Sequence, residues 1–443
     1  MNERVQAAAW RLCGGPYTGL PSRFWWLWAS TFFARVGNFV VPFSVLYFTA
    51  DRHLSESLAG LLIGLYGLGT VVGSLAGGVA SDRVGSKRTL VAGYAAAGMS
   101  TVALGLTTGL LPLSLCMLAV GAFGGTARPA TNALIIELVP PESRVRVFAL
   151  NYWAMNLGFA IACVCAGLMT LAGYVVLFCV DGATTLACAL IVLVRVSSTA
   201  TPRSSTQSPE PTREATREAT RERSTSSGTW LTPLRDRTFA AVIVLSTVTV
   251  ALLQQLTVTL PLAMRASGHS PATYGAIAAL NGLLVCCLQM PISSLVTRQR
   301  LIQSLALGSV LLGLGLGLTA FAAGVAGYAV TVVVWTVGEI IAAPATPVLA
   351  SLLAPNGDQG KYQGALAAAW GVGAVAGPAA GTFILSRGGG TTLWSACAIA
   401  GLVVACGYLC LLRPVTARLA QARHQEEHRV AVSVAPLLGR PAS

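Results

Sequence analysis

The sequence predicts an all-α membrane protein with twelve transmembrane helices in two pseudo-symmetric halves of six. Three observations support this prediction: an apolar composition, a regular series of apolar segments, and an internal repeat. Hydrophobic residues make up 54% of the 443-residue chain and charged residues only 10%, with a mean hydropathy of +0.68. Soluble domains carry roughly 25% charged residues, so most of this chain is expected to contact lipid or other helices.

The apolar segments are each long enough to cross a bilayer, which takes about 20 residues. Their polar connections are short, except for one in the middle of the chain. Windows of about 19 residues place the twelve segments near residues 24–49, 57–80, 89–108, 112–137, 147–171, 175–196, 239–263, 272–296, 302–323, 327–353, 363–385 and 392–412.

The net charge of +13 indicates membrane topology rather than nucleic-acid binding. A nucleic-acid-binding domain would gather its basic residues on one soluble face. Here twenty-four of the 29 lysines and arginines fall in tails and loops on the side of both termini, three on the opposite side, and two within spans. Because basic residues mark cytoplasmic loops, we expect both termini in the cytoplasm of a multi-pass cell-membrane protein.

The chain divides into two helical halves and three polar segments. The polar central segment contains the tandem run Arg-Glu-Ala-Thr-Arg-Glu-Ala-Thr and buries too little apolar surface to offset its ordering entropy. We expect a flexible linker there, with a transient helix held by Glu–Arg pairs as the alternative. The predicted division is an N-terminal tail (1–23), an N-terminal half (24–196), the linker (197–237), a C-terminal half (238–413) and a C-terminal tail (414–443).

Shifting the sequence by 215 residues aligns one half with the other. This single offset places Gly60 on Gly275, Arg83 on Arg298 and Gly158 on Gly373. Parallel six-helix repeats are typical of secondary transporters, whose substrate sites lie near the midplane between the repeats.

The loop between spans two and three carries a recognisable motif, Gly78-Val-Ala-Ser-Asp82-Arg83-Val-Gly85-Ser-Lys87-Arg88. It resembles the Gly-x-x-x-Asp-Arg-x-Gly-Arg-Lys/Arg loop of the major facilitator superfamily, and span count, repeat and linker extend the resemblance over nearly the whole chain. The resemblance implies that this loop latches the cytoplasmic side shut in the outward-open state. Gly78 is expected to allow close helix contact and Gly85 a tight turn. The alternative is a basic loop that only orients the spans.

Two further segments resemble the twelve-span drug–proton antiporters of this superfamily. They are Arg35-Val-Gly-Asn38 followed by Pro42 in span one, and Gly338-Glu339-Ile-Ile with Pro344 in span ten. Span five departs from the antiporter pattern, because Ala-Cys occupies the place of its Gly-Pro. The resemblance therefore leaves export and import both open.

Few ionisable groups lie well inside the spans. A charged side chain at a helix centre costs roughly 2.5 to 3.5 kcal/mol on insertion scales, so such groups are expected to line a cavity or find partners. In the superfamily, spans one, four, seven and ten line the central cavity. The candidate cavity residues on these spans are Arg35, Asn38, Arg128, Gln254, Gln255, Trp335 and Glu339.

Glu339 and Asp181 are the candidate proton-coupling residues. Desolvation favours a neutral carboxyl group, whereas a neighbouring arginine favours the ionised one, so an adjacent Arg35 or Arg128 could hold Glu339 ionised until it is released. The alternatives are a permanently hydrogen-bonded structural Glu339 and a helix-end role for Asp181. The two arginines could equally be helix–helix anchors or substrate ligands.

The predicted function is proton-coupled efflux of small hydrophobic or cationic compounds, as in a multidrug exporter. The alternatives are transport of another small metabolite or nutrient, or a non-transporting receptor or scaffold with this fold. The chain shows no convergent cluster of catalytic groups, and its cysteines lack metal-ligand spacing, so we expect no enzyme activity, metal or cofactor. The expected partners are a small-molecule substrate, protons and lipid, with no nucleic acid, and we expect a monomer.

Overall fold

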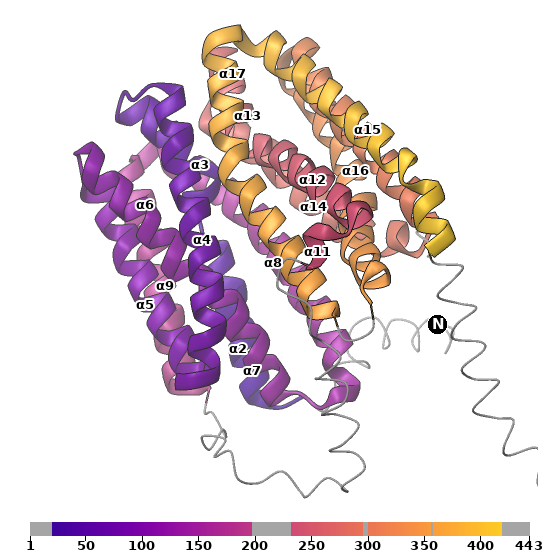
Figure 1. Ribbon diagram of the computed structural model, residues 1–443. Helices are drawn as coiled ribbons and strands as arrows, with labels where there is room; N and C mark the ends of the chain where they lie inside the picture. The colour runs from indigo at the N-terminus through magenta and orange to yellow at the C-terminus, as the bar shows by residue number, and fades with distance from the viewer. Residues whose placement is uncertain (1–19, 197–231, 296–299, 356–357, 419–443) are drawn as a thin grey trace, which may run out of the picture.

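The computed structural model describes residues 20–196, 232–295, 300–355 and 358–418, and within these ranges it contains helices and no strands (Figure 1). Most of the predicted linker and both predicted tails lie outside the described residues. The N-terminal half holds six membrane-spanning segments. Its elements are α2 (Ser22–Val36), α3 (Val40–Leu46), η2 (Tyr47–Asp51), α4 (Glu56–Val84), α5 (Ser86–Leu106), α6 (Leu110–Gly125), α7 (Ala127–Leu138), α8 (Pro141–Met169), η3 (Thr170–Ala172) and α9 (Tyr174–Arg195).

The C-terminal half repeats this plan, and its first span is interrupted near the middle, as span one is. Its elements are α11 (Thr232–Arg235), α12 (Arg237–Leu253), η4 (Gln254–Leu256), α13 (Thr259–Ala266), α14 (Pro271–Leu295), α15 (Leu301–Leu318), η6 (Thr319–Phe321), α16 (Gly324–Leu353) and α17 (Gln359–Cys410).

The last element, α17, contains two spans. Its 52 residues would extend about 78 Å as one straight helix, whereas a bilayer core is about 30 Å thick. Gly389 breaks the helix with φ 75° and ψ 178°, and in Figure 1 the chain turns at the top and runs back down. Eleven helices in the described ranges are long and apolar enough to cross a membrane, and the last of them counts twice. The prediction of twelve transmembrane helices is confirmed.

The two halves meet along two helix pairs, α4 with α17 and α8 with α14. Glycines make this approach possible, as small residues commonly do between membrane helices. A Cβ added to Gly67 would lie 2.9 Å from the carbonyl oxygen of Ala374, and one added to Gly282 would lie 2.8 Å from that of Asn156. These contacts place α4 and α8 directly against the C-terminal half.

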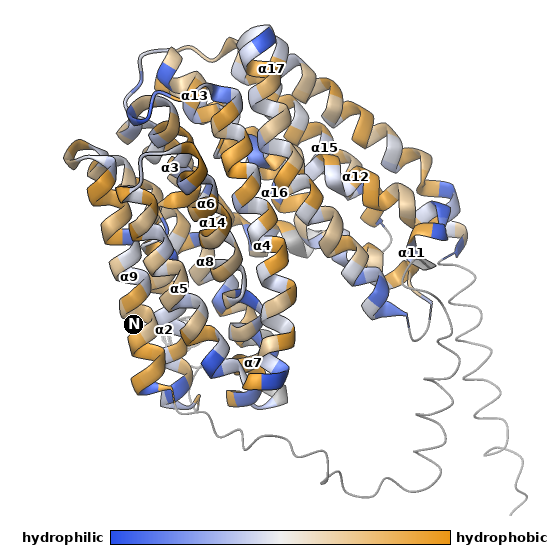
Figure 2. Cartoon of the chain, turned by 60° about the vertical axis from the view of Figure 1, so that its left-hand side comes forward, coloured by the Kyte–Doolittle hydropathy of each residue, from blue (hydrophilic) through white to orange (hydrophobic). Residues whose placement is uncertain are grey.

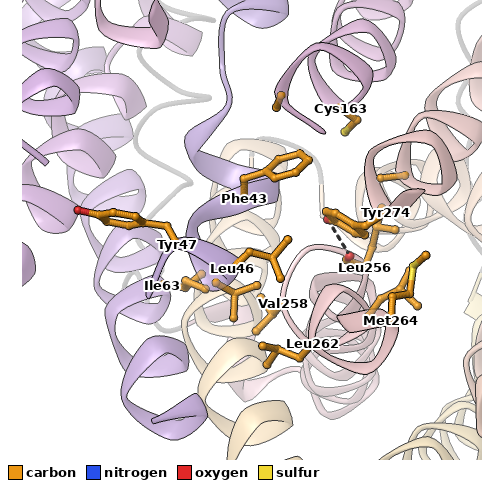
Figure 3. Packing of buried hydrophobic residues seen from close by; sticks show 14 of the residues in the cluster. Phe43, Leu46, Tyr47, Ile63, Cys163, Leu256, Val258, Leu262, Met264 and Tyr274 are labelled. Carbon is orange, nitrogen blue, oxygen red and sulfur yellow. Dashed lines mark hydrogen bonds between the residues drawn. The ribbon is translucent and has the colours of Figure 1, made fainter. Parts of the chain in front are cut away.

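Three hydrophobic clusters show where the halves are joined. The largest contains residues of both halves, and in it Phe43 packs edge-on against Tyr274 with 5.4 Å between ring centroids (Figure 3). The Tyr274 hydroxyl donates a hydrogen bond to the Leu256 carbonyl at 3.2 Å. The other two clusters each belong to one half and lie toward the end that carries the termini. Apolar packing therefore joins the halves at the end opposite the termini.

Two hydrogen bonds between the halves also lie at the end opposite the termini. The Ser57 and Ser386 hydroxyl oxygens are 2.9 Å apart, and Arg265 donates to the Thr49 hydroxyl at 3.1 Å. At the other end α7 and α11 stand apart in Figure 2. The shared cluster and these hydrogen bonds therefore close the end opposite the termini, whereas on the termini side each half has its own separate cluster; we therefore describe this conformation as open on the termini side.

A polar network, which the sequence had not suggested, fastens the C-terminal half at the termini side. Asp236 accepts hydrogen bonds from Arg418 at 2.6 Å and from the Tyr362 hydroxyl at 2.9 Å, while Arg418 also donates to the Leu353 carbonyl. Asp236 caps α12 through the backbone N–H groups of Thr238 and Phe239. Partial burial raises the pKa of Asp236, but the hydrogen bonds from Arg418, Tyr362 and the α12 backbone outweigh it and leave this pKa below its usual value. The network thus ties the start of α12 to the end of α16, the start of α17 and the segment that follows α17.

The topology yields a direct prediction. Single cysteines placed within residues 197–237 and at Ser443 should react with a membrane-impermeant thiol reagent only from the cytoplasmic side, because the basic loops lie with both termini. The measurement is labelling of intact cells against inverted vesicles, in a background without native cysteines. Labelling of either position from outside intact cells would reverse the assigned orientation.

Candidate functional site

Span one is broken at mid-membrane, and Asp181 holds the break. The helix α2 ends at Val36 and α3 begins at Val40. One carboxylate oxygen of Asp181, on α9, accepts the backbone N–H groups of Phe39 at 2.7 Å and Val40 at 3.0 Å. Asp181 is only 4% exposed, and a buried backbone donor without a partner would be costly. Its observed contacts are therefore those of a residue that fixes the bend of span one.

Arg35 lies one helical position before this break. The stem of its side chain packs on span five, where a Cβ added to Gly158 would lie 3.0 Å from both Cβ and Cγ of Arg35. Its guanidinium carbon lies 5.4 Å from the centre of the Phe159 ring. The Nε atom is buried without a hydrogen-bond partner. The absence of a side chain at Gly158 thus leaves room for the stem of Arg35, which explains glycine at that position.

Arg128 and Tyr152 share the region between the halves with Arg35. Arg128, at the start of α7, is exposed, and its charge acts on Arg35. Tyr152, on α8, is 46% exposed and interacts electrostatically with both Arg128 and Glu339. We call Arg35, Arg128, Tyr152 and Glu339 the central polar group.

Glu339 is paired with an amide rather than with an arginine. The Asn281 side chain on α14 donates to Glu339 Oε2 at 2.9 Å and to the Thr336 hydroxyl at 3.1 Å. No arginine lies within ion-pair distance of Glu339 in the described parts of the chain. The expected contact with Arg35 or Arg128 is therefore not made in this conformation. A neutral donor leaves the carboxyl group free to change its protonation state without breaking an ion pair.

Glu339 and Asp181, the two predicted proton-coupling acids, are not neighbours. Asp181 belongs to the N-terminal half and binds the backbone of span one, whereas Glu339 binds Asn281 in the C-terminal half. The Asp181 carboxylate therefore accepts hydrogen bonds from backbone N–H groups, whereas the Glu339 carboxylate accepts one from a side-chain amide.

Two residues expected to line the cavity lie in helix packing instead. Gln255 is 4% exposed, donates to the Gly377 carbonyl at 3.1 Å and accepts from Thr259 at 2.9 Å. It joins span seven to span eleven at the interruption η4. Trp335 is 2% exposed in the cluster shared by both halves, and its backbone packs against Gly315. Trp335 is thus buried in apolar packing rather than exposed to a cavity. Asn38 and Gln254 are partly buried at the breaks of spans one and seven.

The motif loop between α4 and α5 is disengaged in this conformation. Asp82, Arg83 and Arg88 are exposed, and the described chain gives them no side-chain hydrogen bond or ion pair. Gly85 makes the expected turn, with φ 101°. Lys87 donates to the Leu193 carbonyl at 2.8 Å, near the C-terminus of α9. A loop that latches the termini side is expected to be free when that side is open.

The helix contact expected at Gly78 is not observed. A Cβ added there would meet no heavy atom within 4 Å, whereas one added to Gly77 would lie 2.7 Å from the Cα atom of Thr126. The close approach of α4 to the span formed by α6 and α7 thus occurs one residue earlier, at Gly77, which lies on the same face of α4 as Gly69 and Gly73.

Asp82→Asn tests the latch. We expect transport to slow about tenfold, because an amide cannot supply the charge that favours a helix N-terminus or an arginine in the closed state. Substrate affinity, measured by binding to the purified protein, should change only a few-fold. Arg413→Gln, at an exposed position outside the motif loop, is the control for loss of one charge. Equal losses of affinity and turnover for Asp82→Asn would contradict the latch and point to misfolding or a direct binding role.

Sequence reasoning missed the polar partners of the charged groups. Asn281 is neutral and lies in the apolar middle of span eight, and Tyr152 lies near the start of span five. Ser86 likewise donates to Glu137 at 2.7 Å, which explains an acid at the end of span four. A search for uncharged polar residues at the depth of Glu339 would have found Asn281.

Known proteins resemble this chain over most of its length. The family model described as Major Facilitator Superfamily matches residues 27–365 and 256–442. The "Uncharacterized MFS-type transporter YqjV" of Bacillus subtilis is 24% identical, with 77% of this chain and 81% of the relative covered. The "Multidrug resistance protein MdtH" of Aeromonas salmonicida is also 24% identical, with 77% and 82% covered.

Solved structures agree on the fold. A peptide transporter of the POT type crystallised with sulfate superposes with a TM-score of 0.73 at 16% identity, covering 91% of this chain and 96% of the other. The D323A mutant of the nucleoside transporter NupG gives 0.70 at 14% identity, covering 90% and 100%. With the paired six-helix halves, the interrupted first span of each and the motif loop, these matches show that the chain is a membrane transporter, not an enzyme, and belongs to the Major Facilitator Superfamily.

Proposed function

We propose that this transporter exports small, largely hydrophobic organic compounds in exchange for protons. The observation that carries the proposal is the Glu339–Asn281 pair, a mid-membrane carboxyl group whose only hydrogen-bond partner among the described residues is a neutral amide. Glu339 is partly buried and interacts electrostatically with Tyr152 of the other half. Such a group can take up a proton on one side of the membrane and release it on the other as its surroundings change.

Alternating access supplies that change of surroundings. Two conformations with different affinities for proton and substrate are sufficient to couple their movements. The described conformation is open on the termini side, which we assign to the cytoplasm from the basic loops. An exporter loads its substrate from that side, so this conformation is the one expected to bind cytoplasmic substrate while Glu339 gives up its proton.

The relatives support export without deciding it. One is named for multidrug resistance, and a "Na(+), Li(+), K(+)/H(+) antiporter" of Planococcus maritimus is 32% identical over 28% of this chain. A "Hexuronate transporter" of Bacillus subtilis, 28% identical over 28% of the chain, supports the alternative of metabolite transport.

The test is dye transport in inverted membrane vesicles that contain the protein. Vesicles acidified inside should accumulate a hydrophobic fluorescent dye, and a protonophore should release it. Vesicles from cells without the protein provide the control. Accumulation that persists after the pH gradient is collapsed would contradict proton coupling, and release of preloaded dye in response to interior acid would indicate import.

A further inference from the structure

We propose that Arg35 and Arg128 form a binding site for an acid group of the transported compound, either a carboxylate or a phosphate-type oxyanion. The proposal rests on the proposed transport function and names its substrate class. It reverses the charge expected from the sequence, which favoured hydrophobic or cationic compounds.

The first argument is that the two arginines are not neutralised. Neither guanidinium makes a hydrogen bond or ion pair with the described residues, and Arg35 Nε is buried without a partner. Arginines within membrane spans are costly and normally pair with acids or backbone carbonyls. Two like charges that act on each other raise this cost further. An oxyanion between them would satisfy both.

The second argument is that the stem of the Arg35 side chain is packed, while its guanidinium group has no hydrogen-bond partner among the described residues. Gly158 seats the side-chain stem, and the Phe159 ring lies under the guanidinium carbon. A planar guanidinium positioned in this way presents a fork that matches the two oxygens of a carboxylate or phosphate. Lysine would carry the charge without that geometry.

The third argument is the placement of the acid. Glu339 is engaged by Asn281 on the opposite half and so does not cancel the arginines. Tyr152, on the N-terminal half, interacts electrostatically with both Arg128 and Glu339. A compound with an acid group at the arginines and an apolar body would therefore reach across the central polar group from one half to the other.

The local potential can be measured without knowing the substrate. In a background without native cysteines, Tyr152→Cys places a thiol at an exposed position near Arg128. It is reacted with two methanethiosulfonates of similar size, one bearing a sulfonate and one a trimethylammonium group. The ratio of their rates, divided by the ratio for a neutral free thiol, reports the sign of the potential and is independent of thiol reactivity.

We expect the sulfonate reagent to be favoured about tenfold, because nearby positive charge attracts the anionic reagent and repels the cationic one, and solvent at this exposed position screens much of the effect. Arg128→Gln and Arg35→Gln should each reduce the preference several-fold, whereas Arg35→Lys should keep it. A preference for the trimethylammonium reagent in the unaltered arginine background would overturn the proposal. An unchanged ratio in both Gln variants would do the same.

Protection experiments identify the ligand. Sodium benzoate should slow labelling of Tyr152→Cys and benzamide should not, with the effect of benzoate lost in Arg35→Gln. Protection by a short-chain phosphatidylglycerol but not by benzoate would assign the site to lipid headgroups and contradict a substrate site. Equal protection by benzoate and benzamide would show that charge is not recognised. Because these readouts are made without a pH gradient, they can fail while proton-driven transport stands, and the reverse.

Discussion

Replacing Glu339 with glutamine is expected to abolish transport driven by a pH gradient while substrate binding is retained. Glutamine has the shape of a protonated glutamate but cannot exchange a proton, and Asn281 can still bond to its side-chain oxygen. The variant should therefore equilibrate substrate across the membrane without concentrating it. The measurement is uptake into inverted vesicles with and without an imposed gradient.

The matched control is Glu137→Gln. Glu137 bonds to Ser86 at the termini end of span four, away from the central polar group, so this variant should still concentrate substrate. Proton release on substrate addition, followed with a pH dye in detergent, should vanish for Glu339→Gln and persist for Glu137→Gln. If the Glu339 variant still concentrates substrate, Glu339 is structural and the coupling group must be sought at Asp181 or elsewhere.

The number of helices and the repeat could be predicted, because they depend on composition and on spacing along the chain. Close contacts between helices could be predicted where glycines recur at every fourth position of one helix. Gly377 and Gly381, for instance, pack directly against Ala251 and Gln255. A residue without a Cβ at every fourth position marks a contact face whichever helix lies opposite. The same reasoning predicts Arg35 and Glu339 near the midplane and Arg128 well inside span four, since depth follows from position within a span.

The partners of those groups could not be predicted from the sequence. Coulomb attraction favoured an arginine beside Glu339, but the structure brings Asn281 there from span eight, and distances across helices depend on helix rotation and on conformation. Trp335 and Glu339 are four residues apart on one helix face, yet Trp335 is 2% exposed in the closed region. Which part of a face is buried depends on which end of the transporter is closed.

The break in span seven explains why Gln255 is buried rather than exposed to a cavity. A continuous helix would have carried a polar pair toward the cavity, but the 3₁₀ segment η4 changes the direction of the side chains that follow. Gln255 then satisfies backbone within the C-terminal half. Asp181 does the equivalent work at the break of span one, which identifies it as a residue that shapes the site rather than one adjacent to Glu339.

Locking the end opposite the termini is expected to stop transport completely and reversibly. The Ser57 and Ser386 hydroxyl oxygens are 2.9 Å apart across the two halves. Cysteines at both positions should therefore form a disulfide, which needs close side chains and a sulfur–sulfur bond of about 2.05 Å. Because alternating access requires this end to open, the oxidised Ser57→Cys/Ser386→Cys protein should retain substrate binding from the open side but not turn over.

Reduction with dithiothreitol should restore transport, and each single cysteine variant should be unaffected by oxidant. The extent of cross-linking is measured by a mobility shift after cleavage engineered into residues 197–231, so that activity can be compared with the fraction locked. Loss of activity in proportion to cross-linking is the expected result, since a covalent bond across this interface removes the outward-open state from the ensemble. A fully cross-linked protein that still transports would mean that substrate leaves without separation of α4 and α17 at this end, which would contradict alternating access through the interface described here.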